Sequence, residues 1–128
     1  MISITTKSPY AVAALVELAG AGEDPVPIGE LARRRDIPVQ FLEQLFSTLR
    51  RAGVIKSQRG VKGGYMFERS PGEVTVLEVV ELLDGPLGSG SQGVFADASA
   101  AAREVLASST IADVAERERA GGAQMYYI

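Results

Sequence analysis

The sequence predicts a mostly helical fold with one small β-hairpin, and three observations point to it. Apolar residues recur at helical spacing in several segments, and two of these segments are separated by only about three residues. A Gly-rich turn lies between two short runs of strand-forming residues. The 128 residues include no cysteine and no histidine, so the chain supplies no thiolate, no Ser-His-Asp triad and no Cys-ligated zinc or iron–sulfur site. Most classes of enzyme are thereby excluded.

The first element is an amphipathic helix over about residues 7–21, where apolar side chains recur at i, i+4 and i+8. Thr6 and Ser8 offer capping oxygens before it, and Pro9 suits a first helical turn. No apolar run reaches the roughly 18 to 20 residues that a bilayer span needs, and no basic-then-apolar leader opens the chain. We therefore expect a cytoplasmic protein without a membrane partner.

Two short helices follow, over about residues 27–35 and 38–52, and the turn Asp36-Ile37-Pro38 separates them. The first of the two stops there because a residue that precedes proline avoids the helical region. Gly53 is well placed as a left-handed stop for the second helix. Two short helices joined by a tight turn form a helix-turn-helix.

A basic β-hairpin comes next, with strands over about residues 54–59 and 65–69 around a Gly-rich turn. The glycines make the backbone permissive, so Arg59 and Lys62 can project from the hairpin tip. A phosphate-binding P-loop is the alternative for this turn, but a strand follows it where a P-loop requires a helix. A helix-turn-helix followed by a basic hairpin is the winged-helix arrangement, in which the second helix enters the DNA major groove.

The C-terminal third predicts three more helices. Thr75 and Glu78 have the spacing of a capping box at the start of one, and Thr110 begins a short final helix that should end near Arg119. Between them, a helix over about residues 94–108 carries an apolar stripe rich in alanine. The predicted parts are a winged helix-turn-helix domain (1–85), a mobile Gly/Ser linker that packs no core (86–93), a dimerisation helix with a short final helix (94–120) and a tail (121–128).

The dimerisation helix is expected to pair with a second copy, because a lone helix beyond a linker has little of its own domain to pack against. Folding back on the first helix is the alternative. An isologous pair would place two recognition helices about 34 Å apart, which predicts an inverted-repeat DNA site.

Charge is distributed unevenly along the chain. The net charge is −3, yet residues 1–70 carry +3 and residues 33–69 alone carry +6. Phosphate binding responds to the local field, so this basic block is where an anionic partner is expected. A merely solvated basic surface is the alternative.

The polar face of the second helix of the pair offers groups that read DNA. Glutamine can pair with adenine, glutamate can accept from cytosine, and arginine can bind guanine or phosphate. The predicted DNA-binding residues are Gln40, Glu43, Gln44, Ser47, Arg50, Arg51, Arg59 and Lys62. An ordinary solvated face would explain the helix residues alone, but the hairpin and the basic block favour DNA. A metal site built from carboxylates is the one catalytic alternative that the composition leaves open. We expect no catalytic residue, no metal site and no cofactor.

The chain resembles the Rrf-type family of bacterial winged-helix transcription regulators over about residues 1–85. The motifs that carry the resemblance are Thr5-Thr6-Lys7 with Tyr10-Ala11-Val12, Pro25-Val26-Pro27-Ile28, Phe41-Leu42-Glu43-Gln44-Leu45-Phe46, Arg59-Gly60 and Gly63-Gly64-Tyr65. The resemblance implies a homodimer on a palindromic operator, with Gln40, Glu43 and Gln44 as base-edge readers and Arg59 in the minor groove. Cluster-binding members have three cysteines in the linker, where this chain has Gly88-Ser89-Gly90-Ser91-Gln92-Gly93.

The last three residues, Tyr126, Tyr127 and Ile128, resemble the tail of CymR-type regulators of cysteine metabolism, which form a complex with a cysteine synthase. A flexible tail that ends in a carboxylate and an apolar side chain can enter an anion-binding pocket. The alternative is that these residues pack on the dimer partner. The sequence therefore predicts a dimeric, DNA-binding repressor, with cysteine metabolism as its expected field of action. The second functional hypothesis is a protein-interaction module that binds a cysteine-synthase-like enzyme through its tail.

Overall fold

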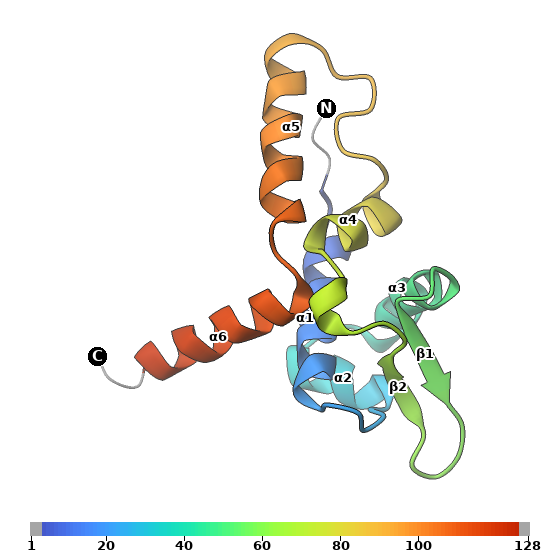
Figure 1. Cartoon of the computed structure of the whole chain (residues 1–128). Coiled ribbons are helices and arrows are strands. Elements are labelled where there is room, and N and C mark those ends of the chain that lie inside the picture. Colours follow the sequence, from blue (N-terminus) through green and yellow to red (C-terminus); the bar gives the residue numbers. More distant parts are fainter. Residues whose placement is uncertain (1–3, 126–128) are drawn as a thin grey trace.

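The computed structural model describes residues 4–125, and the side chains of residues 4–121. Its elements in order are α1 (Lys7–Gly20), α2 (Ile28–Arg35), α3 (Val39–Arg51), β1 (Ile55–Gln58), β2 (Gly64–Phe67), the short 3-10 turn η1 (Pro71–Glu73), α4 (Val76–Asp84), α5 (Gly93–Ala107) and α6 (Ile111–Met125) (Figure 1). Strands β1 and β2 form an antiparallel hairpin with Ile55 opposite Phe67. The predicted fold class, mostly helical with a small hairpin and a winged helix-turn-helix, is confirmed.

Helix α1 is the central element of the body, since it packs against α2, α3, α4 and α6. Its inner face is made of Ala11, Ala14, Leu15 and Leu18, all of them buried. The matching residues of α3 are Leu42, Leu45, Phe46 and Leu49, which are buried as well. Each fully buried side chain of this size contributes about 1.5 to 3 kcal/mol, so this core holds the helix-turn-helix in a fixed orientation.

The start of α1 is held by hydrogen bonds to α4 and not by the predicted cap. Thr6 makes no side-chain capping bond. The Ser8 hydroxyl is buried and donates to Asp84 Oδ2 at 2.5 Å, and Thr5 donates to Asp84 Oδ1 at 2.6 Å. These hydroxyls therefore join the first turn of α1 to the end of α4. Burial raises the pKa of Asp84, but hydrogen bonds from Ser8 and Thr5 outweigh it and leave the pKa below its usual value.

Two predicted helix caps are present. The N–H of Glu78 donates to the Thr75 hydroxyl at 3.1 Å. At the start of α6, the N–H of Asp113 donates to the Thr110 hydroxyl at 3.1 Å, and the N–H of Thr110 donates to the Asp113 carboxylate at 3.0 Å. Both sites satisfy N–H groups that a helix start otherwise leaves unpaired.

The Gly/Ser linker differs from its prediction. Leu87 within it is only 6% exposed, and its N–H donates to Glu81 Oε2 at 3.3 Å. The expectation that this segment packs no core is therefore wrong, because one apolar side chain anchors it. In Figure 1 the linker rises from the end of α4 to the far end of α5, which then runs back toward the body.

Helix α6 is longer than predicted. It continues through Gly121 and Gly122 to Met125, so both the expected end near Arg119 and the expected tail from residue 121 are wrong. Glycine weakens a helix by about 1 kcal/mol relative to alanine, but it does not forbid helical backbone angles. The predicted tail residues Tyr126, Tyr127 and Ile128 lie outside the described residues.

Most of the apolar stripe of α5 faces solvent, whereas Ala102 and Leu106 are half-buried. Val94, Phe95 and Val105 are 72%, 64% and 67% exposed, whereas Ser99, one helical turn after Phe95, is 3% exposed and faces the rest of the chain. The alternative that the stripe folds back on the first helix does not hold for Val94, Phe95 and Val105, but Leu106 at the end of the stripe lines a groove with Val12 and Val16 of α1. Within residues 4–125, no helix has both the length and the apolar character needed to cross a lipid bilayer.

Candidate nucleic-acid interface

The turn between α2 and α3 sets the direction of the second helix. Asp36 has a left-handed backbone (φ 54°), a conformation that aspartate tolerates better than most residues. The N–H of Ile37 then donates to the Ala32 carbonyl at 2.9 Å, and the Ile37 side chain is buried. Because both ends of the turn are held, α3 leaves α2 at a fixed angle with its polar face outward.

The polar face of α3 brings the predicted helix residues together. Gln40, Glu43, Gln44, Arg50 and Arg51 are exposed, and Ser47 is half-buried. A shallow, open concavity on this face is lined by Gln40, Glu43, Gln44, Ser47, Thr48 and Arg51. The same surface therefore presents amide, carboxylate, hydroxyl and guanidinium groups, which are the groups that read base edges. Arg50, also predicted, is not among the residues that line this concavity.

The hairpin is fastened to the helix-turn-helix at two points. Val26, in the segment between α1 and α2, exchanges two backbone hydrogen bonds with Tyr65 of β2, at 2.9 and 2.8 Å. The Tyr65 ring also packs edge-on against Phe46 of α3, with ring centroids 5.1 Å apart. These contacts hold the hairpin in a fixed position beside α3. Sequence reasoning missed Val26, although its position before a proline favours an extended backbone.

Two glycines allow this close approach. A Cβ added to Gly64 would lie 2.4 Å from the Val26 carbonyl carbon, and one added to Gly63 would lie 2.3 Å from the Gln58 carbonyl oxygen. A side chain at Gly64 would therefore push the hairpin away from Val26, and a side chain at Gly63 would open the hairpin turn.

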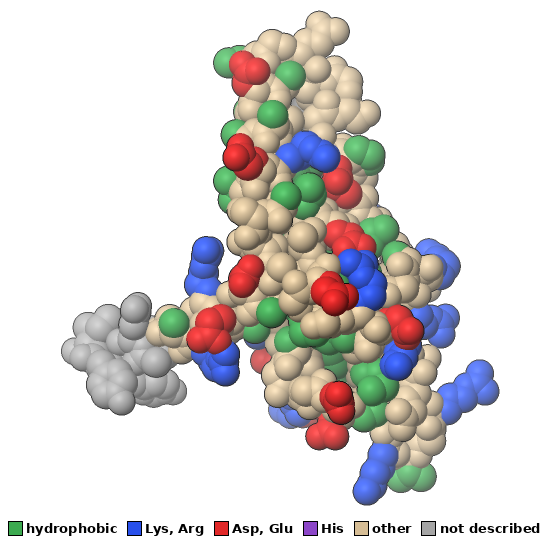
Figure 2. Space-filling view, viewed as in Figure 1, with side chains coloured by type: hydrophobic (Ala, Val, Ile, Leu, Met, Phe, Trp, Pro, Cys, Tyr) green, Lys and Arg blue, Asp and Glu red, His purple; other side chains and the backbone are tan. Residues whose placement is uncertain are grey.

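The hairpin tip presents free cations. Arg59 and Lys62 are exposed, and neither has a hydrogen-bond or ion-pair partner among residues 4–125. In the same part of the chain, Arg50 on α3 also has none. Arg51 donates only to the Thr48 hydroxyl at 3.4 Å. Figure 2 shows Lys and Arg side chains projecting along the side of the molecule that carries α3 and the hairpin. The predicted DNA-binding cations therefore remain available for a partner.

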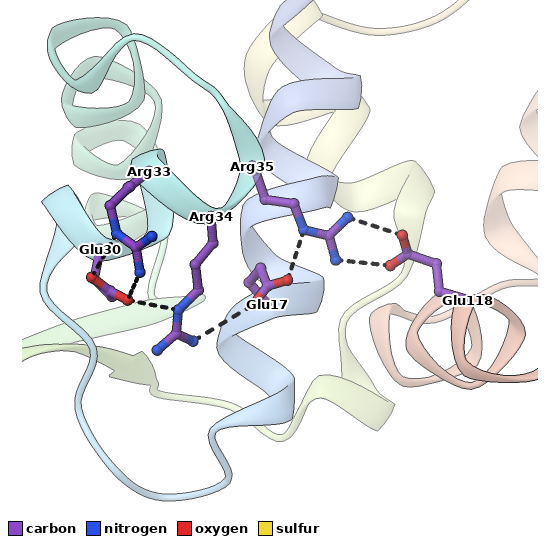
Figure 3. Close-up of polar contacts among 6 residues, drawn as sticks. All are labelled: Glu17, Glu30, Arg33, Arg34, Arg35 and Glu118. Atoms are coloured by element: carbon purple, nitrogen blue, oxygen red, sulfur yellow. Dashed lines mark hydrogen bonds and ion pairs between the residues drawn. The ribbon is translucent and has the colours of Figure 1, made fainter. Parts of the chain in front are cut away.

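The three consecutive arginines of α2 have internal partners (Figure 3). Arg33 and Arg34 both donate to Glu30, and these hydrogen bonds, from Arg33 first, lower the pKa of Glu30 from 4.5 to about 2. Arg35 donates to both oxygens of Glu118 on α6, at 2.9 and 3.0 Å, and to Glu17 on α1 at 3.0 Å. Hydrogen bonding to Glu118 raises the pKa of Arg35 and lowers that of Glu118. Arg35 therefore joins α2 to α1 and α6, away from the hairpin.

Comparison with known proteins gives consistent results. The family Rrf2, described as "Iron-dependent Transcriptional regulator", matches residues 4–93. The HTH-type transcriptional regulator CymR of Bacillus subtilis is 32% identical over 99% of this chain and 100% of its own length. IscR of Xenorhabdus nematophila is 42% identical over 63% of this chain, and the match spans about half (50%) of that regulator. The solved structure of CymR, the global cysteine regulator of B. subtilis, superposes with a TM-score of 0.83 at 32% identity, over 91% of this chain and 98% of that one.

An iron centre does not fit the residues of this chain. The sequence contains neither cysteine nor histidine, and the described residues include no group of three or more acidic side chains placed to hold a metal. Beside the linker, the Glu81 carboxylate of α4 is already bound to Arg103 and to the Leu87 N–H. The Asp84 carboxylate at the end of α4 accepts from Thr5 and Ser8. No step of the function proposed below involves iron.

Proposed function

Since the chain belongs to the Rrf2 family of DNA-binding transcriptional regulators, which are not enzymes, we propose that it acts as a dimeric repressor that reads an inverted-repeat operator. The observation that carries the proposal is the exposed polar and basic surface formed by α3 and the hairpin tip, where Arg50, Arg59 and Lys62 have no partner among the described residues. Such a surface matches a major groove with an adjacent minor groove. Its action on bacterial DNA would place it in the cytoplasm.

The roles we propose follow from the chemistry of each group. Gln40, Glu43, Gln44 and Ser47 contact base edges, because they line the concavity of α3. Arg50 and Arg51 follow at the C-terminal end of the same helix and bind phosphates. Arg59 enters the minor groove from the hairpin tip, and Lys62 neutralises a phosphate beside it.

Two apolar surfaces that the described residues leave uncovered support the dimer. One is the solvent-facing stripe of α5 that includes Val94, Phe95 and Val105. The other is an apolar groove between α1, α4 and α6, where the end of α5 meets the body, lined by residues that include Val12, Val16, Val76, Val80, Leu106 and Val114. A second copy would cover both surfaces at once and remove this apolar area from water.

The experiment that tests the proposal is retention of fragmented genomic DNA by the purified protein, followed by titration of the retained fragment. If three to five cations per protomer bind phosphates, a dimer neutralises about 6 to 10, and affinity falls about 10³- to 10⁵-fold between 50 and 200 mM salt. We expect the retained fragments to share an inverted repeat and to be bound by two protomers. Retention of random fragments, or affinity independent of salt, would contradict the proposal.

A second candidate function is control of cysteine metabolism through the C-terminal residues. The observation that favours it is the full-length similarity to CymR. We propose that residues 126–128 bind a cysteine-synthase-like enzyme, and deletion of these three residues tests this. Loss of enzyme binding with DNA binding retained would support the proposal, whereas enzyme binding that survives the deletion would contradict it.

A further inference from the structure

The junction between α4 and α5 is held by side chains that the function above does not use. The Glu81 carboxylate of α4 accepts from the Leu87 N–H of the linker at 3.3 Å. The same oxygen, Oε2, also accepts from Arg103 on α5. One carboxylate therefore joins three successive parts of the chain, and α5 packs against α4 beneath it.

Tight packing adds to this polar contact. Gly88 has a left-handed backbone (φ 81°), and a Cβ added there would lie 2.7 Å from Ser99 Cβ and 3.1 Å from Ser99 Oγ. Ser99 is 3% exposed, and its hydroxyl has no hydrogen-bond partner among the described residues. A buried hydroxyl without a partner is unfavourable, so packing of the linker backbone, and not polar bonding, keeps Ser99 in this position.

These contacts hold α5 in place through protein groups alone. We propose that Glu81, Leu87, Gly88, Ser99 and Arg103 form a metal-free clasp that sets the direction of α5 relative to the winged helix-turn-helix. They are positioning residues, because none of them lies on the surface formed by α3 and the hairpin. The family is described as iron-dependent. In this chain, the clasp would set the direction of α5 without iron.

The clasp has a functional consequence that rests on the proposed dimer. Helix α5 carries the exposed apolar stripe, so its direction determines how far apart the two copies of α3 lie. One base pair of DNA changes the separation of two half-sites by about 3.4 Å and their relative rotation by about 36°. A rigid clasp therefore predicts sharp discrimination between operators whose half-sites differ in spacing.

The test compares Gly88→Ala with Gly90→Ala. Both glycines have left-handed backbones (φ 81° and 77°), but an added Cβ at Gly90 meets nothing within 4 Å. The two variants therefore share the backbone strain, and only Gly88→Ala adds the clash with Ser99. We expect Gly88→Ala to lower the midpoint of thermal unfolding by about 5 °C more than Gly90→Ala does.

Operator fragments with the spacer lengthened or shortened by one base pair give the functional readout. We expect the wild-type protein and Gly90→Ala to lose about tenfold in affinity for each change, and Gly88→Ala to lose only about twofold. Ferrous iron or EDTA should leave these ratios unchanged in every variant. Equal behaviour of the two alanine variants, or spacing discrimination that disappears with EDTA, would overturn the clasp. If the wild-type protein binds no operator at all, the proposed function fails instead.

Two further variants keep the proposal testable if Gly88→Ala does not fold. Arg103→Ala removes the ion pair to Glu81 without a clash, and we expect it to weaken spacing discrimination, whereas the control Arg117→Ala on α6 does not. Ser99→Ala keeps the Cβ contact and removes only the unpaired hydroxyl, so it should leave discrimination intact and raise the unfolding temperature. Loss of discrimination in Ser99→Ala would show that the hydroxyl binds something, and would overturn a clasp made by packing.

Discussion

Arg59 is the residue whose role can be isolated most cleanly, because its side chain has no internal partner in the described part of the chain. We expect Arg59→Ala to weaken operator binding by about 1 to 3 kcal/mol, as the loss of a groove contact does, while the dimer stays intact. Arg117→Ala, which removes the same charge from an exposed position on α6, is the matched control. Unchanged binding by Arg59→Ala in a mobility-shift titration would remove Arg59 from the interface.

Glu30 predicts how the protein responds to acid. Its pKa is lowered from 4.5 to about 2 by hydrogen bonds from Arg33 and Arg34. A carboxyl group with a lowered folded-state pKa contributes stability above its unfolded pKa, and loses that contribution as pH falls through the folded value. We expect the free energy of unfolding to fall between about pH 4.5 and pH 2, and to fall less steeply in Glu30→Gln. Urea unfolding at several pH values measures the free energy of unfolding of the wild-type protein and of Glu30→Gln. If both free energies fall equally with pH, the ion pairs of Glu30 are contradicted.

Among the elements, α5 makes the clearest prediction for assembly. Phe95→Asp and Val105→Asp place charges on the apolar stripe at two positions that are exposed in a single copy. We expect a folded monomer with weakened operator binding, because two linked recognition helices are needed for tight binding. Light scattering measures the mass, and Glu104→Gln at another exposed position of α5 is the control. A dimer that survives both aspartates would place the interface elsewhere.

Helix α6 carries a prediction for stability. Gly121 lies inside the helix, and a Cβ added there meets nothing within 4 Å. Gly121→Ala should therefore raise the free energy of unfolding by about 0.5 to 1 kcal/mol, since alanine favours helix over glycine. Denaturant unfolding measures the change. A destabilised variant would mean that the helix ends before Gly121, as the sequence alone suggested.

The elements also show which features sequence reasoning can reach. The caps at Thr75 and Thr110 were predicted because a cap depends on residues only three positions apart. The hydrogen bonds between Val26 and Tyr65 were missed because the two residues are far apart in the sequence. The burial of Leu87 was missed because it depends on how the linker packs against the helices. The predicted end of α6 was wrong because Gly121 and Gly122 disfavour helical structure but do not end the helix. The polar face of α3 was predictable, since a regular helix places its residues by periodicity alone.

At the scale of the whole molecule, the distribution of charge explains how an acidic chain can bind DNA. The net charge is −3, but the arginines of α2 form ion pairs within the chain, while the cations of the hairpin tip and α3 form none among the described residues. The field near DNA is therefore set by one side of the molecule. Two copies joined through α5 would place the cationic surfaces of both copies, formed by α3 and the hairpin tip, on one face of the double helix.

Operator binding by two protomers is the most direct test of this account. The retained genomic fragment is titrated between 50 and 200 mM salt, beside the same fragment with one half-site scrambled. We predict that two protomers bind the intact site, that affinity falls about 10³- to 10⁵-fold across this salt range, and that scrambling one half-site abolishes tight binding. Equal affinity for both fragments with no dependence on salt would contradict the account.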